Sequence, residues 1–150
     1  MHVLDRLDVR RAEPADAGFI RDLGRTAFAE YSPNSAREVT SMAGRGRAFV
    51  ATDRGVPVGF VLLEPNSDET VHVSAIAVTE SARGRGIGRR LLEHGEEAAR
   101  SGGARELSLV TADGNLAALE LFLRAGFRRT RRTARYYSRG QAAIWLSKTL

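Results

Sequence analysis

A glycine-rich turn between an apolar run and a helical segment constrains this chain most. The run is Thr70–Val78, the turn is Arg83–Gly88 and the helical segment is Arg89–Arg100. The first backbone N–H groups of a helix lack intrahelical acceptors, and the helix dipole places partial positive charge there. Because glycines carry no Cβ atoms, a phosphate group can approach these N–H groups closely. The pattern therefore predicts a phosphate-binding loop at a helix N-terminus, with added charge from the arginines Arg83, Arg85, Arg89 and Arg90.

Two common phosphate-binding motifs do not fit this turn. A dinucleotide-binding fingerprint that starts at Gly84 requires a third glycine where Arg89 stands. A Walker loop requires glycine, lysine and then serine or threonine, a sequence that the chain does not contain. The pattern that remains is Arg-x-x-Gly-x-Gly, formed by Arg83, Gly86 and Gly88.

Length and hydropathy favour a single globular domain over residues 1–150. The chain has 150 residues, of which 43% are hydrophobic, and this length is sufficient to bury one core. No apolar run approaches the ~20 residues of a membrane span. The segment Met1–Arg10 also lacks the apolar middle of a signal peptide. We therefore expect a cytoplasmic protein that makes no membrane contact.

Composition also excludes several kinds of chemistry. The absence of cysteine excludes disulfides, a thiol nucleophile and cysteine-ligated zinc, and three scattered histidines give no metal-ligand spacing, so we expect no metal. The net charge is +5, and Lys148 is the only lysine among 23 basic residues. A positive surface suits a cofactor with several phosphates and equally an RNA-bound partner, and composition does not separate the two.

Hydrophobic periodicity and turn signals predict a mixed α/β domain with a central sheet of about seven strands and about four helices. A helix-start signal precedes the first helix, a hairpin turn lies at Asp53–Gly55, and Asp113 is the expected cap of the last helix. The expected strands are 7–11, 48–52, 57–63, 70–78, 106–111, 127–137 and 142–146, and the expected helices are 14–29, 35–42, 89–100 and the segment between Asp113 and Gly126.

The turn and this order of elements resemble the GNAT N-acetyltransferases, in which such a loop binds the pyrophosphate of acetyl-CoA. A second block, Asn115, Ala118, Phe122 and Gly126-Phe127, is similar to that family's Asn-x-x-Ala-x-x-x-Tyr-x-x-x-Gly-Phe pattern. Phe122 departs from it, because family members often use the tyrosine at this position to protonate the leaving thiolate. An active enzyme would therefore need another acid.

A third block, Arg135-Tyr136-Tyr137, resembles the ending of the ribosomal-protein N-terminal alanine acetyltransferases, a branch of the family that acetylates α-amines. Tyr137 matches the tyrosine to which that branch assigns the acid role. A packed strand tyrosine is the alternative, with Tyr136 facing the other way. The branch is also expected to carry an acidic residue soon after Gly126-Phe127, where this chain has Arg128 and Arg129.

The resemblance implies roles for further residues. His72 falls where histone-modifying members carry the glutamate that deprotonates the amine, and a histidine that simply sits on one strand face is the alternative. Glu69 is a rival base or a solvated acid, and loss of the amine proton to bulk water needs neither residue. The backbone N–H of Ile76 would meet the oxyanion, where the fourth strand bulges and separates from the fifth. The implied cofactor contacts are Ile76, Ala77, Val78, Arg83, Gly84, Arg85, Gly86, Ile87, Gly88, Arg89, Asn115, Ala118 and Phe122. A helix N-terminal cap is the alternative role of Asn115.

The resemblance implies an acetyltransferase that moves the acetyl group of acetyl-CoA to a primary amine by direct attack. The expected acceptor is a peptide or protein N-terminus or a small-molecule amine. Tyr31 and Phe28 are candidates to line its pocket, and core packing is the alternative for Phe28. A non-catalytic acyl-CoA-binding module is the alternative that Phe122 suggests, and a basic RNA-associated protein is another. Base-stacking aromatic residues among the basic ones would favour RNA binding, and only Tyr136 and Tyr137 lie there, so we do not expect a nucleic-acid partner. The arginine run Arg128–Arg135 is a solvated strand face or a surface for an acidic peptide or RNA. We expect a monomer or a homodimer.

Overall fold

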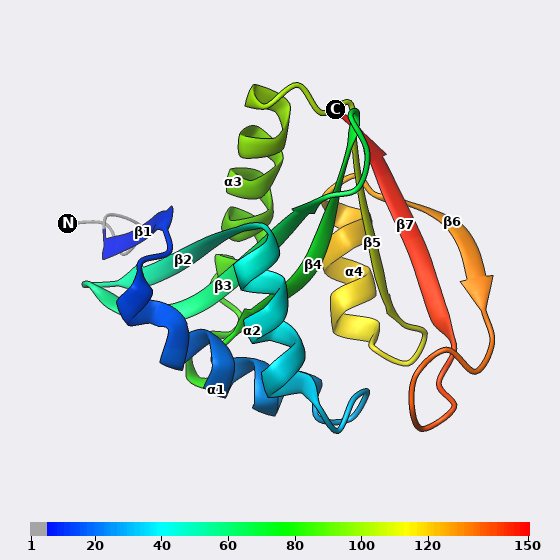
Figure 1. The fold of residues 1–150 in the computed structure, drawn as a ribbon, viewed down its shortest axis with the longest axis horizontal. Coiled ribbons are helices and arrows are strands. Elements are labelled where there is room, and N and C mark those ends of the chain that lie inside the picture. Colours follow the sequence, from blue (N-terminus) through cyan, green and yellow to red (C-terminus); the bar gives the residue numbers. More distant parts are fainter. Residues whose placement is uncertain (1–5) are drawn as a thin grey trace.

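The computed structural model describes residues 6–150, and its core element is a seven-stranded sheet in the order β1-β2-β3-β4-β5-β7-β6 (Figure 1). All neighbouring strands pair antiparallel except β4 and β5, which are parallel. The mixed sheet predicted from the sequence is confirmed. The strands are β1 (Leu7–Arg11), β2 (Arg47–Asp53), β3 (Val56–Pro65), β4 (Thr70–Val78), β5 (Glu106–Ala112), β6 (Arg128–Thr133) and β7 (Ala143–Thr149).

Four α-helices cover the two faces of this sheet (Figure 1). They are α1 (Ala17–Phe28), α2 (Ser35–Arg45), α3 (Ile87–Ser101) and α4 (Leu116–Arg124), with short 3-10 turns at Pro14–Asp16 and Glu80–Ala82. The amphipathic helices α3 and α4 pack on a core that includes Leu91, Leu119 and Leu146. On the opposite face, α1 and α2 pack through Ile20 and Val39 on residues of β2, β3 and β4. Within residues 6–150, no helix is both long and apolar enough to span a bilayer.

The parallel strands β4 and β5 separate soon after they begin. Their pairing runs from Thr70 opposite Glu106 to His72 opposite Ser108 and then stops. On its other side, β4 stays paired with β3 to Val78, with a shift in register at Ser74, between Val73 and Ala75. Figure 1 shows β4 and β5 meeting near the C-terminus and diverging below it. The bulge and separation expected for the fourth strand are therefore present, with the bulge two residues before Ile76.

Two sequence predictions about local structure are wrong. Asn115, and not Asp113, caps α4, because the Asn115 side chain accepts a hydrogen bond from the Ala118 N–H group. The predicted strand 127–137 ends at Thr133, since Arg135 adopts a left-handed conformation with φ 54°. Tyr136 and Tyr137 therefore lie in the β6–β7 loop, where both N–H groups donate to the Gln141 carbonyl. Strand alternation does not apply to them, and their rings lie 5.0 Å apart.

The close packing of α1 on α2 gives a testable prediction. Gly24→Ala should destabilise the fold by about 1–3 kcal/mol, because the new Cβ atom would overlap the Val39 side chain. The matched control is Gly44→Ala on α2, whose Cβ atom would meet no atom within 4 Å; it should be neutral or stabilising by up to about 1 kcal/mol. Urea unfolding followed by circular dichroism measures both. Equal midpoints for the two variants would contradict this packing.

Candidate active site

The glycine turn before α3 exposes a row of backbone donors. Gly84 and Gly86 adopt left-handed conformations, with φ 79° and φ 78°, and a Cβ atom at either position would point into open space. Among the described residues, none accepts a hydrogen bond from the N–H groups of Gly84–Arg89. These groups precede or open α3, which begins at Ile87. The turn therefore has the free donors and the open approach that an anion requires.

The arginines of this turn are directed toward protein groups. Arg85 forms an ion pair with Asp53 of 3.0 Å, and Arg83 donates to the Val78 carbonyl at 3.3 Å. Arg89 contacts Glu93 at 3.1 Å, and Arg90 donates to a backbone carbonyl of β1. The predicted positive charge is present around the turn, but these contacts hold the guanidinium groups. The backbone N–H groups of Gly84–Arg89 are therefore the donors of this turn that no described residue engages.

A cavity of about 500 Å³ lies where β4 and β5 separate. Its walls come from α1, α2 and the loop between them, from β3, β4 and β5, and from the β6–β7 loop. Tyr31, His72, Asn115 and Tyr137 line it, and so does Phe28, which also packs against the core under α1 and α2. The structure therefore brings together candidate residues that are far apart in the sequence.

Two loops close this cavity on one side. The N–H group and the Oγ–H of Ser138 donate to the Tyr31 carbonyl at 3.4 and 3.0 Å. The Gln141 side chain donates to the Glu30 carbonyl at 3.0 Å. These bonds fix the β6–β7 loop against the α1–α2 loop, so that the rings of Tyr31 and Tyr137 lie 5.4 Å apart.

Tyr137 is a half-buried phenol in this cavity. Burial raises its pKa to about 12, with smaller contributions from Tyr136 and Tyr31. A phenol with a raised pKa keeps its proton at neutral pH and can donate it. The hydroxyl that Phe122 lacks is thus available from another part of the chain.

His72 lies on β4 at the last residue pair before the strands separate. Its Nδ1 is 3.0 Å from the Ser108 Oγ. Burial lowers the pKa of His72, and the negative charge of Glu64 opposes that shift. The imidazole is therefore mainly neutral near pH 7 and can accept a proton.

Glu64 is a cavity residue that the sequence reasoning missed. It ends the apolar run of β3 and lies opposite His72 in the β3–β4 register. Its carboxylate accepts hydrogen bonds from the Ser74 Oγ–H at 2.6 Å and from the Arg45 Nε–H at 2.7 Å. Burial favours a higher pKa for Glu64, but these two hydrogen bonds outweigh it and lower the pKa. A charged residue at the end of an otherwise apolar strand was the signal that could have revealed it.

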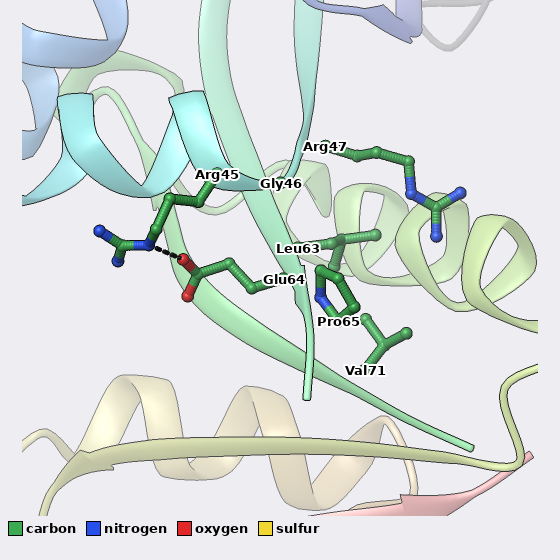
Figure 2. Close-up of a pocket in the computed structure, with 7 residues that line it drawn as sticks. All are labelled: Arg45, Gly46, Arg47, Leu63, Glu64, Pro65 and Val71. Carbon is green, nitrogen blue, oxygen red and sulfur yellow. Dashed lines mark hydrogen bonds and ion pairs between the residues drawn. The ribbon is translucent and has the colours of Figure 1, made fainter. Parts of the chain in front are cut away.

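A smaller cavity of about 270 Å³ lies on the other side of Glu64 (Figure 2). Leu63, Pro65 and Val71 form its apolar part, and Figure 2 shows the Arg45 side chain reaching across to the Glu64 carboxylate. Arg47 donates instead to a carbonyl of α3 at 3.3 Å. This cavity holds neither the tyrosines nor His72, so the larger cavity is the candidate active site.

Several predicted site residues lie outside the larger cavity. Glu69 is exposed, with its carboxylate 3.9 Å from Arg105, so the structure does not bring it to His72 and Tyr137. Phe122 is buried in the core, with its ring 6.0 Å from that of Phe127. Ala77 is buried against α1 and α2. Ile76, Val78 and Ala118 pack against the α3–α4 core, which leaves their backbone as the feature available to a ligand. The described residues contain no histidine and carboxylate cluster suited to a metal ion.

Comparisons with known proteins agree on one family. Residues 17–127 match the acetyltransferase (GNAT) family. A mycothiol acetyltransferase of Rhodococcus opacus (strain B4) is 37% identical over 121 residues, which are 77% of this chain and 37% of that protein. The N-alpha-acetyltransferase 30 of Schizosaccharomyces pombe (strain 972 / ATCC 24843) is 30% identical over 101 residues, 65% of this chain and 67% of that protein. The chain thus spans little more than a third of the Rhodococcus protein's length.

A solved structure matches over nearly the whole chain. It is described as IAA acetyltransferase from Bacillus cereus ATCC 14579, with a TM-score of 0.81 and 26% sequence identity. The match covers 96% of this chain and 99% of that one.

The surroundings of His72 predict a pH effect. Its pKa should lie below the ordinary value of about 6.5, and Glu64→Gln should lower it further by removing the opposing negative charge. Because His72 then has a lower pKa in the folded chain than in the unfolded chain, its protonation favours unfolding. The free energy of unfolding should therefore fall as the pH drops below about 6.5, and His72→Gln should reduce this loss of stability. NMR titration of the imidazole measures the pKa, and a value above 6.5 would contradict the burial argument.

Proposed function

Given that this chain belongs to the acetyltransferase (GNAT) family, we propose that this enzyme transfers the acetyl group of acetyl-CoA to the α-amine of a peptide or protein. The observation that carries the proposal is the joint placement of two features. The anion-binding turn follows β4 directly, and the same strand forms a wall of the cavity that holds Tyr137 and His72. The proposed binding position of the acetyl-CoA diphosphate thus lies at the end of β4, and the proposed reaction centre lies beside the same strand.

The donor would bind through the backbone. We assign its diphosphate to the N–H groups of Gly84–Arg89, which have no protein acceptor among the described residues. The pantetheine arm would lie between β4 and β5, along the backbone of Ile76–Val78, with Asn115 and Ala118 on the α4 side. The thioester supplies the activated acetyl group, and the N–H of Ile76 is the proposed donor to the developing oxyanion.

The cavity suits an amine acceptor. The ionisable groups that line it include Glu38, Glu64 and His72, and no arginine or lysine of residues 6–150 does so, although the whole chain is basic. The carboxylates attract an ammonium group, and neutral His72 is placed to accept its proton before the amine attacks. Glu64 is a poorer base, because hydrogen bonds from Ser74 and Arg45 stabilise its charged form.

Tyr137 is the proposed general acid. As the amine nitrogen bonds to the carbonyl carbon and the C–S bond breaks, the departing thiolate takes the phenol proton. The attacking nitrogen loses a proton as the amide forms, and this proton restores the phenol. The position of Tyr137 also argues against a non-catalytic acyl-CoA-binding module, because the half-buried Tyr137 in the cavity would supply the proton donor that Phe122 lacks.

A peptide acceptor has two lines of support. The Arg135–Tyr137 block resembles the ribosomal-protein alanine acetyltransferases, and the related Schizosaccharomyces protein is an N-alpha-acetyltransferase. A small-molecule amine is the second candidate, favoured by the related mycothiol acetyltransferases.

A panel of acceptors tests this proposal. Thiol release from acetyl-CoA would be measured with peptides of differing first residues, polyamines and amino sugars, and calorimetry with coenzyme A would measure donor binding. We expect coenzyme A to bind and at least one peptide to give the highest kcat/KM. Binding without turnover of any amine would indicate an acyl-CoA-binding module, and turnover of small amines alone would reject the peptide acceptor.

Replacing the proposed acid gives a sharper test. Tyr137→Phe should lower kcat by about 100-fold or more, because it removes the proton donor while keeping the ring that packs on Tyr31. The affinity for coenzyme A should be unchanged, since the diphosphate lies at the turn before α3. An unchanged kcat in this variant would remove Tyr137 from the acid role.

A further inference from the structure

The sheet face that lines the cavity at β5 extends across β7 to β6, the arginine-rich strand at the edge of the sheet. Opposed residues in neighbouring strands project from the same face. Val110 of β5 lines the cavity and pairs with Trp145 of β7, which pairs with Arg131 of β6. A second row runs beside it, because Ser147 of β7 pairs with both Ser108 and Arg128. Arg128 and Arg131 therefore share the face on which the cavity opens.

Among the described residues, no helix packs an apolar face on this part of the sheet. The apolar core under α1 and α2 is formed with β2, β3 and β4. The other face of β5 and β7 is covered by α3 and α4, where Leu146 and Ile144 are buried. Trp145 lies between these two residues in the strand and so faces the uncovered side, where its indole donates to the Thr133 Oγ at 3.0 Å. The uncovered face of β5, β7 and β6 is called the outer track below.

Aromatic rings line the outer track from the cavity to the arginines. Tyr137 contacts Tyr136 at 5.0 Å, and Tyr136 contacts Trp145 at 5.6 Å between ring centroids. The Arg131 guanidinium lies over the Trp145 ring, 4.5 Å from its centroid. This contact holds the Arg131 guanidinium above β7, on the cavity side of β6. The N–H groups of the guanidinium can still donate hydrogen bonds to a carboxylate.

The charges along the outer track change sign. Inside the cavity are the carboxylates of Glu38 and Glu64, whereas the track ends at Arg128 and Arg131. Neither arginine has an ion-pair partner within residues 6–150, in contrast to Arg132, which pairs with Asp113 at 3.3 Å. A ligand that matches this order carries a positive group at one end and negative groups farther along.

We propose that the outer track binds acidic side chains of the acceptor peptide, so that the enzyme prefers N-termini with aspartate or glutamate near the third to fifth positions. This inference rests on the proposed peptide acceptor. Strands lie ~4.8 Å apart, so β6 is roughly 10 Å from the cavity wall at β5. An extended peptide advances about 3.3 Å per residue and covers this span with about three residues. Carboxylates on these residues meet the Arg128 and Arg131 guanidinium groups.

Matched peptides test the preference. The best peptide of the acceptor panel would be made with aspartates at positions three to five and with asparagines there, leaving its first two residues unchanged. We expect the aspartate peptide to have a KM at least about tenfold lower at low salt, with kcat nearly equal, and this advantage to shrink as salt is added. Equal kcat/KM values for the two peptides would overturn the proposal.

Variants of β6 locate the effect on the outer track. The double substitution Arg128→Gln and Arg131→Gln should abolish the preference for aspartate while leaving kcat with the asparagine peptide unchanged. The matched control is Arg129→Gln on the same strand, because Arg129 pairs with Leu146 and faces α4; it should retain the preference. If Arg129→Gln lost the preference for the aspartate peptide as fully as the double variant, the assignment of this preference to the outer track would be contradicted.

Two further outcomes separate the alternatives. Tight binding of a single-stranded RNA that Arg128→Gln and Arg131→Gln abolish, together with no discrimination between the peptides, would indicate a nucleic-acid surface and overturn the proposal. Turnover of small amines but of no peptide would instead reject the peptide acceptor itself, and the acidic preference with it.

Discussion

The separation of β4 from β5 is the constraint on which the site depends. Beyond His72 and Ser108, the two strands give up a parallel ladder, and their facing N–H and C=O groups become available to a ligand. The fold tolerates this because each strand keeps its other neighbour. β4 remains paired with β3 to Val78, and β5 pairs with β7 along its whole length. The two halves of the sheet are also joined by the core under α3 and α4, which includes residues from both.

The same strand places the anion-binding turn. β4 leads into the turn at Glu80–Ala82, whose Ala82 is buried in the core, and α3 then starts at Ile87. A left-handed residue at Gly86 turns the chain into the helix, and a Cβ atom there would meet no other atom within 4 Å, so the approach to the turn is open. The distance between the proposed diphosphate position and the cavity is therefore set by one continuous segment, from β4 through the turn to the start of α3.

Local sequence signals predicted the sheet and the turn well. The bounds of β4 were predicted to the residue, since alternating buried and half-buried positions leave little freedom in register. Glu64 was missed because its role depends on Arg45 and Ser74, which reach it from other elements. Tyr136 and Tyr137 were placed on a strand because aromatic residues favour strands, whereas the left-handed Arg135 ends the pairing before them. Glu69 was a plausible base by proximity to β4, but it lies on the solvent side of the strand start.

The position of Tyr137 in a loop has a consequence for how this site works. A tyrosine at position 122 would be held in place by α4, and its position would not depend on the bound acceptor. Tyr137 is instead held by the turn that Gln141 closes, by the Ser138 hydrogen bonds to the α1–α2 loop and by its ring contact with Tyr31. These contacts also form one side of the cavity in which the acceptor is proposed to lie. Acceptor recognition and proton donation therefore depend on one set of contacts, so that an acceptor which distorts the α1–α2 loop also displaces the proposed acid.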